Sequence, residues 1–154
     1  MFENIIKNVH NRHPLIHCIT NYVSINDCAN IVLACGGAPI MAEDINEVSQ
    51  ITSICQGLDI NIGMLNDNKL SSMLKAGATA NELGIPVILD PVGAGSSDYR
   101  IKAVQNLMSN VQFGVIRGNV SEIKAIAAKQ GIHNIAAGVY ETMQKNKSAM
   151  GVEA

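Results

Sequence analysis

The sequence predicts an α/β fold, with a mostly parallel sheet and helices on both of its faces. Two observations predict it: short apolar runs alternate with segments of helical periodicity, and Gly or other turn-forming residues separate them. The lengths of these segments suit βαβ units with right-handed crossovers. Because the 154 residues contain no repeat, low-complexity segment or linker, we expect a single α/β domain over residues 1–154.

The N-terminal elements are expected in the order helix, strand, helix, strand, helix. They are a helix with Phe2, Ile5, Ile6 and Val9 on one face, a strand over Pro14–Thr20, a helix over Ser24–Cys35 that stops at Gly36-Gly37, a short strand over Ala38–Met41, and a helix that carries Ile45, Val48, Ile51 and Ile54. Asp44 precedes this last helix and is predicted to cap it.

The alternation continues to the end of the chain. The expected elements are a strand over Leu58–Gly63, a helix over Asp67–Leu83 ended by Gly84, a strand over Ile85–Asp90, a helix over Asp98–Ser109, a strand over Phe113–Arg117 and a helix over Val120–Lys129. Beyond Gly131, residues 132–154 show helical spacing through Ile135, Ala136, Val139 and Met143.

Composition excludes several classes of function. The formal net charge is −2 and the aromatic content is 3% with no Trp, so we expect no nucleic-acid partner. The apolar runs are too short to span a bilayer and the N-terminus has no apolar signal-peptide region, so we expect no membrane association. The four cysteines form no CxxC pair, which is typical of reduced thiols in a cytoplasmic protein.

Polar residues and glycines follow the expected strands. They are Thr20-Asn21, Met41, Asn61–Gly63, Asp90–Gly93 and Arg117–Asn119. In an open α/β sheet, ligands bind outside the carboxyl ends of the strands. The sequence therefore predicts a site at this edge, with a carboxylate, amides and a guanidinium close together.

Two interpretations of Asp90 are about equally supported by the pattern. Asp-Pro is a common turn start, so Asp90 can simply cap the loop that follows. A carboxylate that ends an apolar strand can instead hold Mg²⁺ through water. The adjacent GAGSSD segment lacks the third glycine of a dinucleotide-binding fingerprint, and the chain has no Walker-type phosphate loop.

The segment VIRGNVSEI, Val115–Ile123, also has two interpretations. Asn119 and Glu122 have the spacing of a capping box at the start of a helix. The functional interpretation adds Arg117, since a guanidinium binds phosphate through two hydrogen bonds, and a helix N-terminus that favours an anion.

Five segments carry a resemblance to a known family. They are PLIHCITNYVSINDCAN, GGAPIMAED, LDINIGMLN, ANELGIPVILDPVGAGSSDYR and VIRGNVSEI, in this order between Pro14 and Ala128. Together they resemble the hydroxyethylthiazole kinases of the ribokinase-like superfamily. The resemblance implies a three-layer ribokinase-like fold and transfer of the γ-phosphate of ATP, with Mg²⁺, to the hydroxyl of 4-methyl-5-(2-hydroxyethyl)thiazole in thiamine salvage. It also implies a homotrimer with the thiazole site between subunits.

The resemblance assigns roles only where the motifs match. Asn21 and Met41 correspond to thiazole contacts, and Arg117 to an ATP contact. Asp90 and Glu122 match positions near Mg²⁺ and the phosphates. Asn119, with Glu122, reproduces the NxxE pattern of the superfamily and is grouped with the ATP-binding residues.

The sequence departs from the family in one respect. A Gly-Thr-Gly-Cys segment, which in the family builds an anion hole and supplies the catalytic cysteine, does not occur here. We therefore assign no catalytic residue and expect a C-terminally truncated fold that represents the N-terminal portion of the kinase domain. The alternative function is a non-catalytic fragment that binds thiazole or nucleotide weakly, or that needs a second chain for activity.

Overall fold

The structure, a computed structural model, describes residues 2–129 and contains one parallel five-stranded sheet with the strand order β2-β1-β3-β4-β5. The strands are β1 (Leu15–Ile19), β2 (Ala38–Ile40), β3 (Gly57–Asn61), β4 (Val87–Asp90) and β5 (Val115–Ile116). The α/β fold with a parallel sheet is thereby confirmed. The helical spacing noted beyond Gly131 lies outside the described residues.

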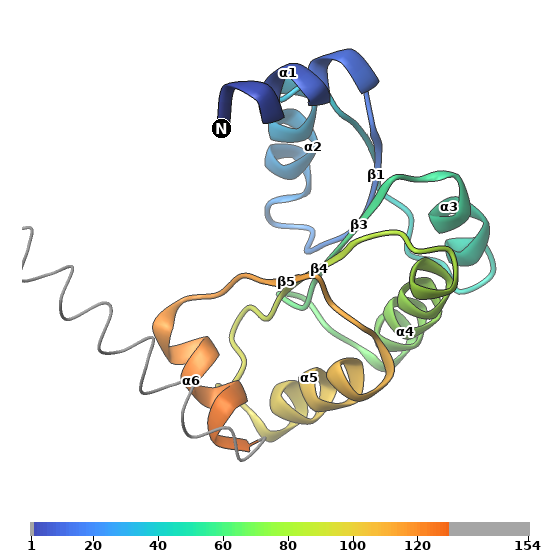
Figure 1. Ribbon diagram of the computed structural model, residues 1–154. Coiled ribbons are helices and arrows are strands. Elements are labelled where there is room, and N and C mark those ends of the chain that lie inside the picture. Colours follow the sequence, from blue (N-terminus) through green and yellow to red (C-terminus); the bar gives the residue numbers. More distant parts are fainter. Residues whose placement is uncertain (1, 130–154) are drawn as a thin grey trace, which may run out of the picture.

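Six helices of the described part connect or flank these strands. They are α1 (Phe2–Arg12), α2 (Ile25–Ala34), α3 (Val48–Ile54), α4 (Asp67–Glu82), α5 (Asp98–Asn110) and α6 (Val120–Lys129). Helices α1 and α2 lie on one side of the sheet, and α3, α4 and α5 on the other (Figure 1). The chain first moves outward from β1 to β2, then returns past β1 to β3, so right-handed crossovers place α2 and α3 on opposite faces.

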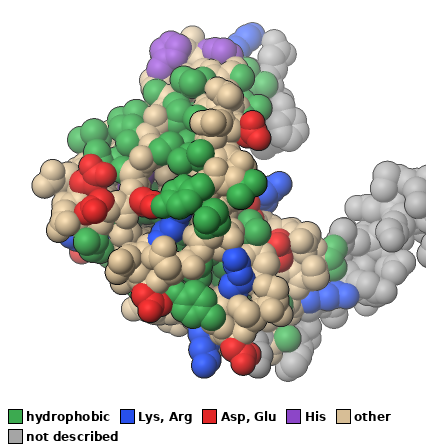
Figure 2. All heavy atoms as spheres, turned by 180° about the vertical axis from the view of Figure 1, so that it is seen from behind, with side chains coloured by type: hydrophobic (Ala, Val, Ile, Leu, Met, Phe, Trp, Pro, Cys, Tyr) green, Lys and Arg blue, Asp and Glu red, His purple; other side chains and the backbone are tan. Residues whose placement is uncertain are grey.

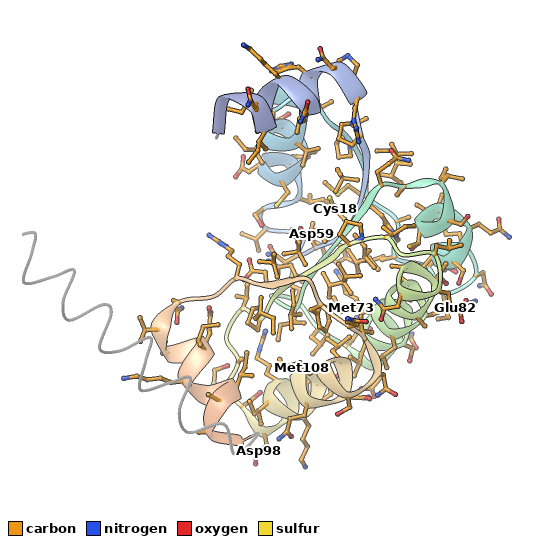
Figure 3. The ribbon with its side chains drawn as sticks, viewed as in Figure 1. Cys18, Asp59, Met73, Glu82, Asp98 and Met108 are labelled. Carbon is orange, nitrogen blue, oxygen red and sulfur yellow. The ribbon has the colours of Figure 1, made fainter. Side chains whose placement is uncertain are left out.

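The main core lies between the sheet and helices α3 to α5. Alternate strand residues point into it, among them Ile19, Leu58, Ile60, Val87 and Leu89, all at most 2% exposed. From the helices come Met73, Val104 and Leu107, and Met73 points from α4 toward the sheet (Figure 3). Burial of this apolar face is what fixes the registers of the strands.

The opposite face of the sheet is only partly covered by the described helices. Ile88 on β4 is 40% exposed and Val115 on β5 is 52% exposed, although both are apolar residues of parallel strands. Such strands are usually buried on both faces. Exposed apolar residues also occur on α1 and α2, namely Ile5, Ile6, Ile31 and Leu33. Hydrophobic side chains gather in the upper half of the face drawn in Figure 2.

Two predicted elements differ from the structure by more than two residues in length. Helix α3 begins only at Val48 and its N-cap residue Glu47 makes no side-chain cap bond, so the prediction that Asp44 caps this helix is wrong. Asp44 Oδ1 instead accepts hydrogen bonds from the backbone and side-chain nitrogens of Asn46, which closes a turn over residues 45–47. An Asp side chain often bonds to the backbone two residues on, and that contact competes with helix initiation.

The predicted strand over Phe113–Arg117 is shorter than expected. Only Val115–Ile116 pairs with β4, with Val115 opposite Ile88 and Ile116 opposite Leu89. Backbone hydrogen bonds from Gly114 to Val87 and from Arg117 to Leu89 flank this short ladder. They keep Arg117 in line with the carboxyl end of the sheet.

None of the helices among residues 2–129 is long and apolar enough to cross a membrane.

Candidate functional site

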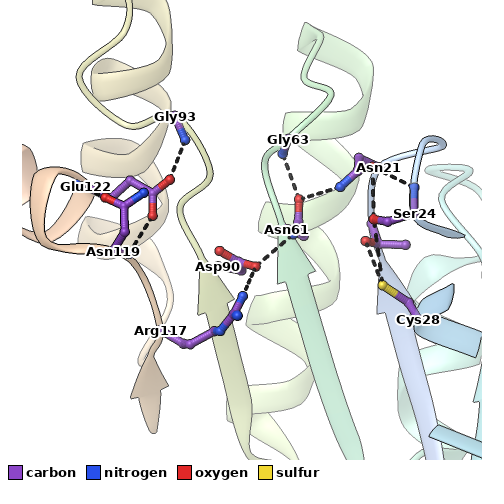
Figure 4. A network of polar contacts seen from close by, with 11 residues as sticks. Asn21, Ser24, Cys28, Asn61, Gly63, Asp90, Gly93, Arg117, Asn119 and Glu122 are labelled. Atoms are coloured by element: carbon purple, nitrogen blue, oxygen red, sulfur yellow. Dashed lines mark hydrogen bonds and ion pairs between the residues drawn. The ribbon is translucent and has the colours of Figure 1, made fainter. Parts of the chain in front are cut away.

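The predicted residues lie at the carboxyl ends of their strands. Asp90 ends β4, Met41 and Arg117 directly follow β2 and β5, and Asn21 comes two residues after β1. The strand order reverses between β1 and β3, because the chain first goes outward to β2 and then continues on the other side of β1. Such a switch point is where open α/β sheets bind ligands. Asn21 and Asn61 stand on its two sides (Figure 4).

Asp90 is held by two donors at this edge. Its Oδ2 atom accepts a hydrogen bond of 3.0 Å from Asn61 Nδ2 and forms an ion pair of 3.0 Å with Arg117 Nη1. The side chain of Asp90 is 15% exposed, whereas that of Arg117 is 78% exposed. The guanidinium of Arg117 therefore pairs with a carboxylate that Asn61 holds in place. Most of the Arg117 side chain stays accessible to an anion.

Asn21 closes the loop between β1 and α2. Its Oδ1 atom accepts from both the backbone nitrogen and the hydroxyl of Ser24, each at 3.1 Å. Its Nδ2 atom donates to Asn61 Oδ1 at 3.3 Å. A continuous chain of hydrogen bonds thus runs from Ser24 through Asn21, Asn61 and Asp90 to Arg117 (Figure 4).

The capping box predicted for the segment after β5 is present. Asn119 Oδ1 accepts from the backbone nitrogen of Glu122 at 3.0 Å, and Glu122 Oε2 accepts from the backbone nitrogen of Asn119 at 2.8 Å. Glu122 Oε1 also accepts from the backbone nitrogen of Gly93 at 3.0 Å. This third bond joins the start of α6 to the loop after β4, which local sequence spacing did not indicate.

Two of the hollows at this edge are lined by Arg117 or by Met41. One, of about 330 Å³, is lined by Asp90, Val92, Arg117, Gly118, Asn119 and Glu122. The other, of about 180 Å³, is lined by Cys18, Thr20, Tyr22, Ile25, Met41, Ala42 and Glu43. The first contains charged groups and a helix N-terminus, and the second is largely apolar around Met41. The edge therefore offers one place for an anion and another for a small, partly apolar molecule.

A buried lysine near Met41 was missed by sequence reasoning. Lys69 is 4% exposed, and its Nζ atom donates to the carbonyl of Thr20 and lies 2.8 Å from a carboxylate oxygen of Glu43. The ammonium also lies 4.6 Å from the ring centroid of Tyr22, whose hydroxyl donates to Glu43. A lysine in the first turn of a helix gives no sequence signal that it points inward.

The charge of Glu43 is stabilised by these contacts. Partial burial alone raises the pKa of its carboxyl, but hydrogen bonds from Lys69 and Tyr22 outweigh it, so the pKa lies below its usual value. Glu43 is therefore an anion at neutral pH, and it holds the loop after β2 against the loop after β1.

Arg100 was also missed by sequence reasoning. Its guanidinium donates to the carbonyls of Ile62, Gly63 and Val92 at 2.6 to 2.8 Å. These carbonyls belong to the segments after β3 and β4, so Arg100 ties the two loops together from α5. All three acceptors are backbone atoms, which indicates a structural role.

Asp59 lies in β3, two residues before Asn61, with its side chain on the partly covered face of the sheet. Burial, together with the charge of Asp90, raises the pKa of the Asp59 carboxyl to about 6, although Arg117 acts in the opposite direction. Asp59 and Cys18 are neighbours in the register of β1 and β3 (Figure 3). Asp59 is thus an ionisable group next to the candidate site that the sequence pattern did not single out.

The oxygens near Arg117 can be compared with the needs of Mg²⁺. Asp90 and Glu122 line the same hollow and supply carboxylate oxygens, the ligand type that Mg²⁺ prefers, and this ion commonly uses one or two carboxylates together with phosphates and waters. Within residues 2–129, no group of three His, Cys, Asp or Glu side chains is placed to hold a metal ion. The donor set therefore fits an ion completed by phosphate and water, and not a site made of protein ligands alone.

Comparisons with known proteins show which family the chain resembles. The family described as "Hydroxyethylthiazole kinase family" matches residues 6–153. The hydroxyethylthiazole kinase of Clostridium acetobutylicum is 61% identical over 132 residues, and that of Alkaliphilus metalliredigens is 59% identical over 124 residues. These alignments cover 86% and 80% of this chain, and 48% and 46% of the two relatives.

A solved structure gives the same result. The hydroxyethylthiazole kinase protein of Pyrococcus horikoshii OT3 superposes with a TM-score of 0.81 at 39% identity, over 86% of this chain and 52% of that chain. The chain spans about half the length of the relatives it matches.

Proposed function

The chain belongs to the hydroxyethylthiazole kinase family, and from this membership we propose that it serves ATP-dependent phosphorylation of the hydroxyl of 4-methyl-5-(2-hydroxyethyl)thiazole in thiamine salvage. One observation carries the proposal. A largely apolar hollow beside Met41 and a charged hollow beside Arg117 lie along the same sheet edge, and the hydrogen-bonded side chains of Asn21, Asn61 and Asp90 follow the strands between them. A kinase for a small alcohol needs an acceptor site and a phosphate site side by side.

The thiazole end is assigned to Asn21 and Met41. Met41 lines the apolar hollow, where a flexible thioether packs well against a flat ring. Asn21 stands at the switch point between β1 and β3, with both amide atoms already bonded to protein. Its position is thereby fixed before a ligand arrives, which lowers the entropic cost of binding.

The phosphate end is assigned to Arg117 and Asn119. The Arg117 side chain is mostly exposed, so its guanidinium can donate to phosphate oxygens while one nitrogen stays paired with Asp90. Asn119 caps α6 and so holds the helix N-terminus at the hollow, where the helix dipole favours an anion.

Asp90 and Glu122 are the residues that would hold Mg²⁺. Both residues line the shared hollow, and each carboxylate has lone pairs that its bonds to Asn61 and Arg117, or to Gly93 and Asn119, do not use. A bound Mg²⁺ neutralises phosphate charge, which is the main requirement of phosphoryl transfer. The protein's own contribution is to fix the two carboxylates on β4 and α6.

The proposal includes a homotrimer in the cytoplasm. Its thiazole site would lie between subunits, near the exposed Tyr22 and Val23 that follow Asn21. An exposed apolar residue beside a ligand hollow is typical of a surface that another chain covers. Sedimentation of the purified chain should give a mass three times its 16.4 kDa, and a monomer that binds the thiazole would contradict this part.

Binding to the 154-residue chain tests the function directly. Calorimetry should detect hydroxyethylthiazole and, separately, ATP with Mg²⁺. Met41→Ala should lower the affinity for the thiazole by about tenfold, since a buried hydrophobic contact of this size is worth roughly 1–3 kcal/mol. It should leave the affinity for the nucleotide unchanged. Arg117→Ala should lower the affinity for the nucleotide and leave the affinity for the thiazole unchanged.

Matched controls lie at the opposite edge of the sheet. Leu83→Ala removes an exposed apolar side chain at the end of α4, and Arg12→Ala removes an exposed cation at the end of α1. Neither should change either affinity. Absence of thiazole binding by the unsubstituted chain, or equal effects of Met41→Ala and Leu83→Ala, would refute the proposed thiazole site.

A further inference from the structure

We propose that Asn61 is a positioning residue. The two polar atoms of its amide fix the orientation of Asn21 at the thiazole-binding end of the site and of Asp90 at the phosphate-binding end. The inference rests on the proposed function for the identity of the two ligands. Asn61 itself is 8% exposed and lines neither hollow, so it acts through its neighbours and not by touching a ligand.

The orientation of the Asn61 amide is fixed by its partners. Its Oδ1 atom faces the backbone nitrogen of Gly63 at 2.8 Å, which can only donate. Its Nδ2 atom faces the carboxylate of Asp90 at 3.0 Å, which can only accept. A flipped amide would place two donors against each other and two acceptors against each other, so only one orientation satisfies both contacts.

This orientation dictates the orientation of Asn21. Because Asn61 Oδ1 is an acceptor, Asn21 must turn its own Nδ2 toward Asn61, at 3.3 Å. Asn21 Oδ1 then points toward Ser24, where it accepts two hydrogen bonds. Asn61, at the end of β3, therefore fixes the orientation of the Asn21 amide beyond the end of the neighbouring strand β1.

The other half of the amide acts on the phosphate end. Asn61 Nδ2 holds Asp90 Oδ2, the same oxygen that pairs with Arg117 Nη1. Since the Arg117 side chain is mostly exposed, the position of its guanidinium depends on where that oxygen is held. Loss of the Asn61 donor would release Asp90 and, with it, the Arg117 contact.

Because the oxygen and the nitrogen serve different ends, two substitutions separate them. Asn61→Asp keeps an acceptor for Gly63 and Asn21, but it removes the donor to Asp90 and places a second carboxylate beside it. Asn61→Leu removes both atoms. A residue that only supports folding would not distinguish the two ends in this way.

The experiment measures both affinities by calorimetry on the full 154-residue chain, with hydroxyethylthiazole and with ATP and Mg²⁺ as probes. Asn61→Asp should lower the affinity for the nucleotide by about tenfold or more, because Asp90 loses its donor and gains a like charge beside it. The affinity for the thiazole should stay within about twofold, because the acceptor for Asn21 is kept. Asn61→Leu should weaken both ligands. Urea unfolding of each variant identifies any effect that comes from stability alone.

Asn81→Asp provides the matched control. Asn81 also uses both amide atoms, which bond the backbone nitrogen and carbonyl of Gln112 at the amino end of the strands. The same substitution there should change stability without separating the two affinities. Equal weakening of both ligands by Asn61→Asp, or no weakening of either by Asn61→Leu, would overturn the proposal.

A readout without ligand separates this inference from the proposed function. The side-chain amide signals of Asn21 in NMR spectra should stay in place in Asn61→Asp and shift in Asn61→Leu. That NMR result supports the positioning role of Asn61 whether or not the chain binds the two probes. If the unsubstituted chain binds neither probe, only the proposed function is refuted. Unshifted Asn21 signals in Asn61→Leu would overturn the inference whatever the ligands do. If the leucine variant does not fold, Asn61→Ser, which is too short to reach either partner, takes its place.

Discussion

Glu122 Oε1 accepts a hydrogen bond of 3.0 Å from the backbone nitrogen of Gly93, while Glu122 Oε2 caps α6 through Asn119. One carboxylate thus fixes both the start of a helix and the glycine loop after β4. The φ angle of Gly93 is +68°, a left-handed conformation that glycine adopts without strain, and this turns its N–H toward Glu122.

Glu122→Gln should destabilise the chain. The variant has a single acceptor oxygen, so either Gly93 or Asn119 loses its partner, and we expect a loss of about 1–2 kcal/mol in the free energy of unfolding. Urea denaturation measures it. Glu82→Gln, at the end of α4 and on the opposite edge, should stay within about 0.5 kcal/mol. Equal effects of the two substitutions would show that the contact with Gly93 contributes nothing.

Asp59→Asn should stabilise the chain at pH 7 but not at pH 4. The pKa of Asp59 is raised from 3.8 to about 6 in the fold, so the folded state binds more protons than the unfolded state between these values. Stability from this group is therefore complete below pH 3.8 and is lost as the pH rises through about 6.

Asparagine carries no charge and removes that pH dependence. The expected gain at pH 7 is on the order of 1–3 kcal/mol, from urea unfolding measured at several pH values. A gain that is the same at pH 4 and pH 7 would mean that the charge of Asp59 is not its cause.

His17→Leu tests a buried histidine with the opposite pH behaviour. The ring is fully buried, with Nε2 2.8 Å from the carbonyl of Ala42 and Nδ1 2.9 Å from the hydroxyl of Thr52. Burial lowers its pKa from 6.5, although the hydrogen bond to Ala42 opposes this. The folded state therefore binds fewer protons than the unfolded state, and stability is lost as the pH falls below about 6.5.

The leucine variant should be about 1–3 kcal/mol less stable at pH 7, because the carbonyl and the hydroxyl lose their buried partner. The difference from the unsubstituted chain should shrink as the pH falls, which denaturation at pH 5 and pH 7 would show. Thr52→Val, which removes the hydroxyl alone, should give a smaller loss. A difference independent of pH would mean that the pKa of His17 is not lowered in the fold.

Gly77→Ala should destabilise through a steric clash that a second substitution relieves. A Cβ atom at Gly77 in α4 would lie 2.5 Å from Cγ2 of Val111, and Gly77 is itself buried. Alanine normally favours a helix over glycine, so a loss of about 1–3 kcal/mol would come from overpacking alone.

The double variant Gly77→Ala with Val111→Ala should be more stable than the sum of the single effects predicts, which a double-mutant cycle measures. Purely additive effects would show that the two side chains do not share this space.

Local patterns in the sequence determined most of the secondary structure. The Ser24–Cys35 pattern became a helix that Gly36 ends, because apolar spacing and a glycine with φ of +91° act over a few residues. The Asn119–Glu122 capping box formed for the same reason. Local patterns were not sufficient at Asp44. Its side chain bonds Asn46 and does not cap a helix, and α3 begins only at Val48.

Placement of the candidate residues at strand ends also followed from the sequence. Asn21, Met41, Asp90 and Arg117 lie at or within two residues of the ends of apolar runs, and parallel strands bring such positions to one edge. The sequence could not give the contacts between them. Asn61 joins Asn21, forty residues away, to Asp90, and this requires β3 to lie between β1 and β4.

The tertiary structure alone decided which polar residues are buried and with what partners. The sequence analysis did not single out Lys69 or Arg100, yet Lys69 is enclosed beside Glu43 and Arg100 binds three carbonyls of two loops. Propensity and periodicity depend on residues within a turn or two of one another. Burial of a charge depends on the partners that the strand order brings within hydrogen-bond distance, and these partners lie 26 to 49 positions away for Lys69 and up to 38 positions away for Arg100.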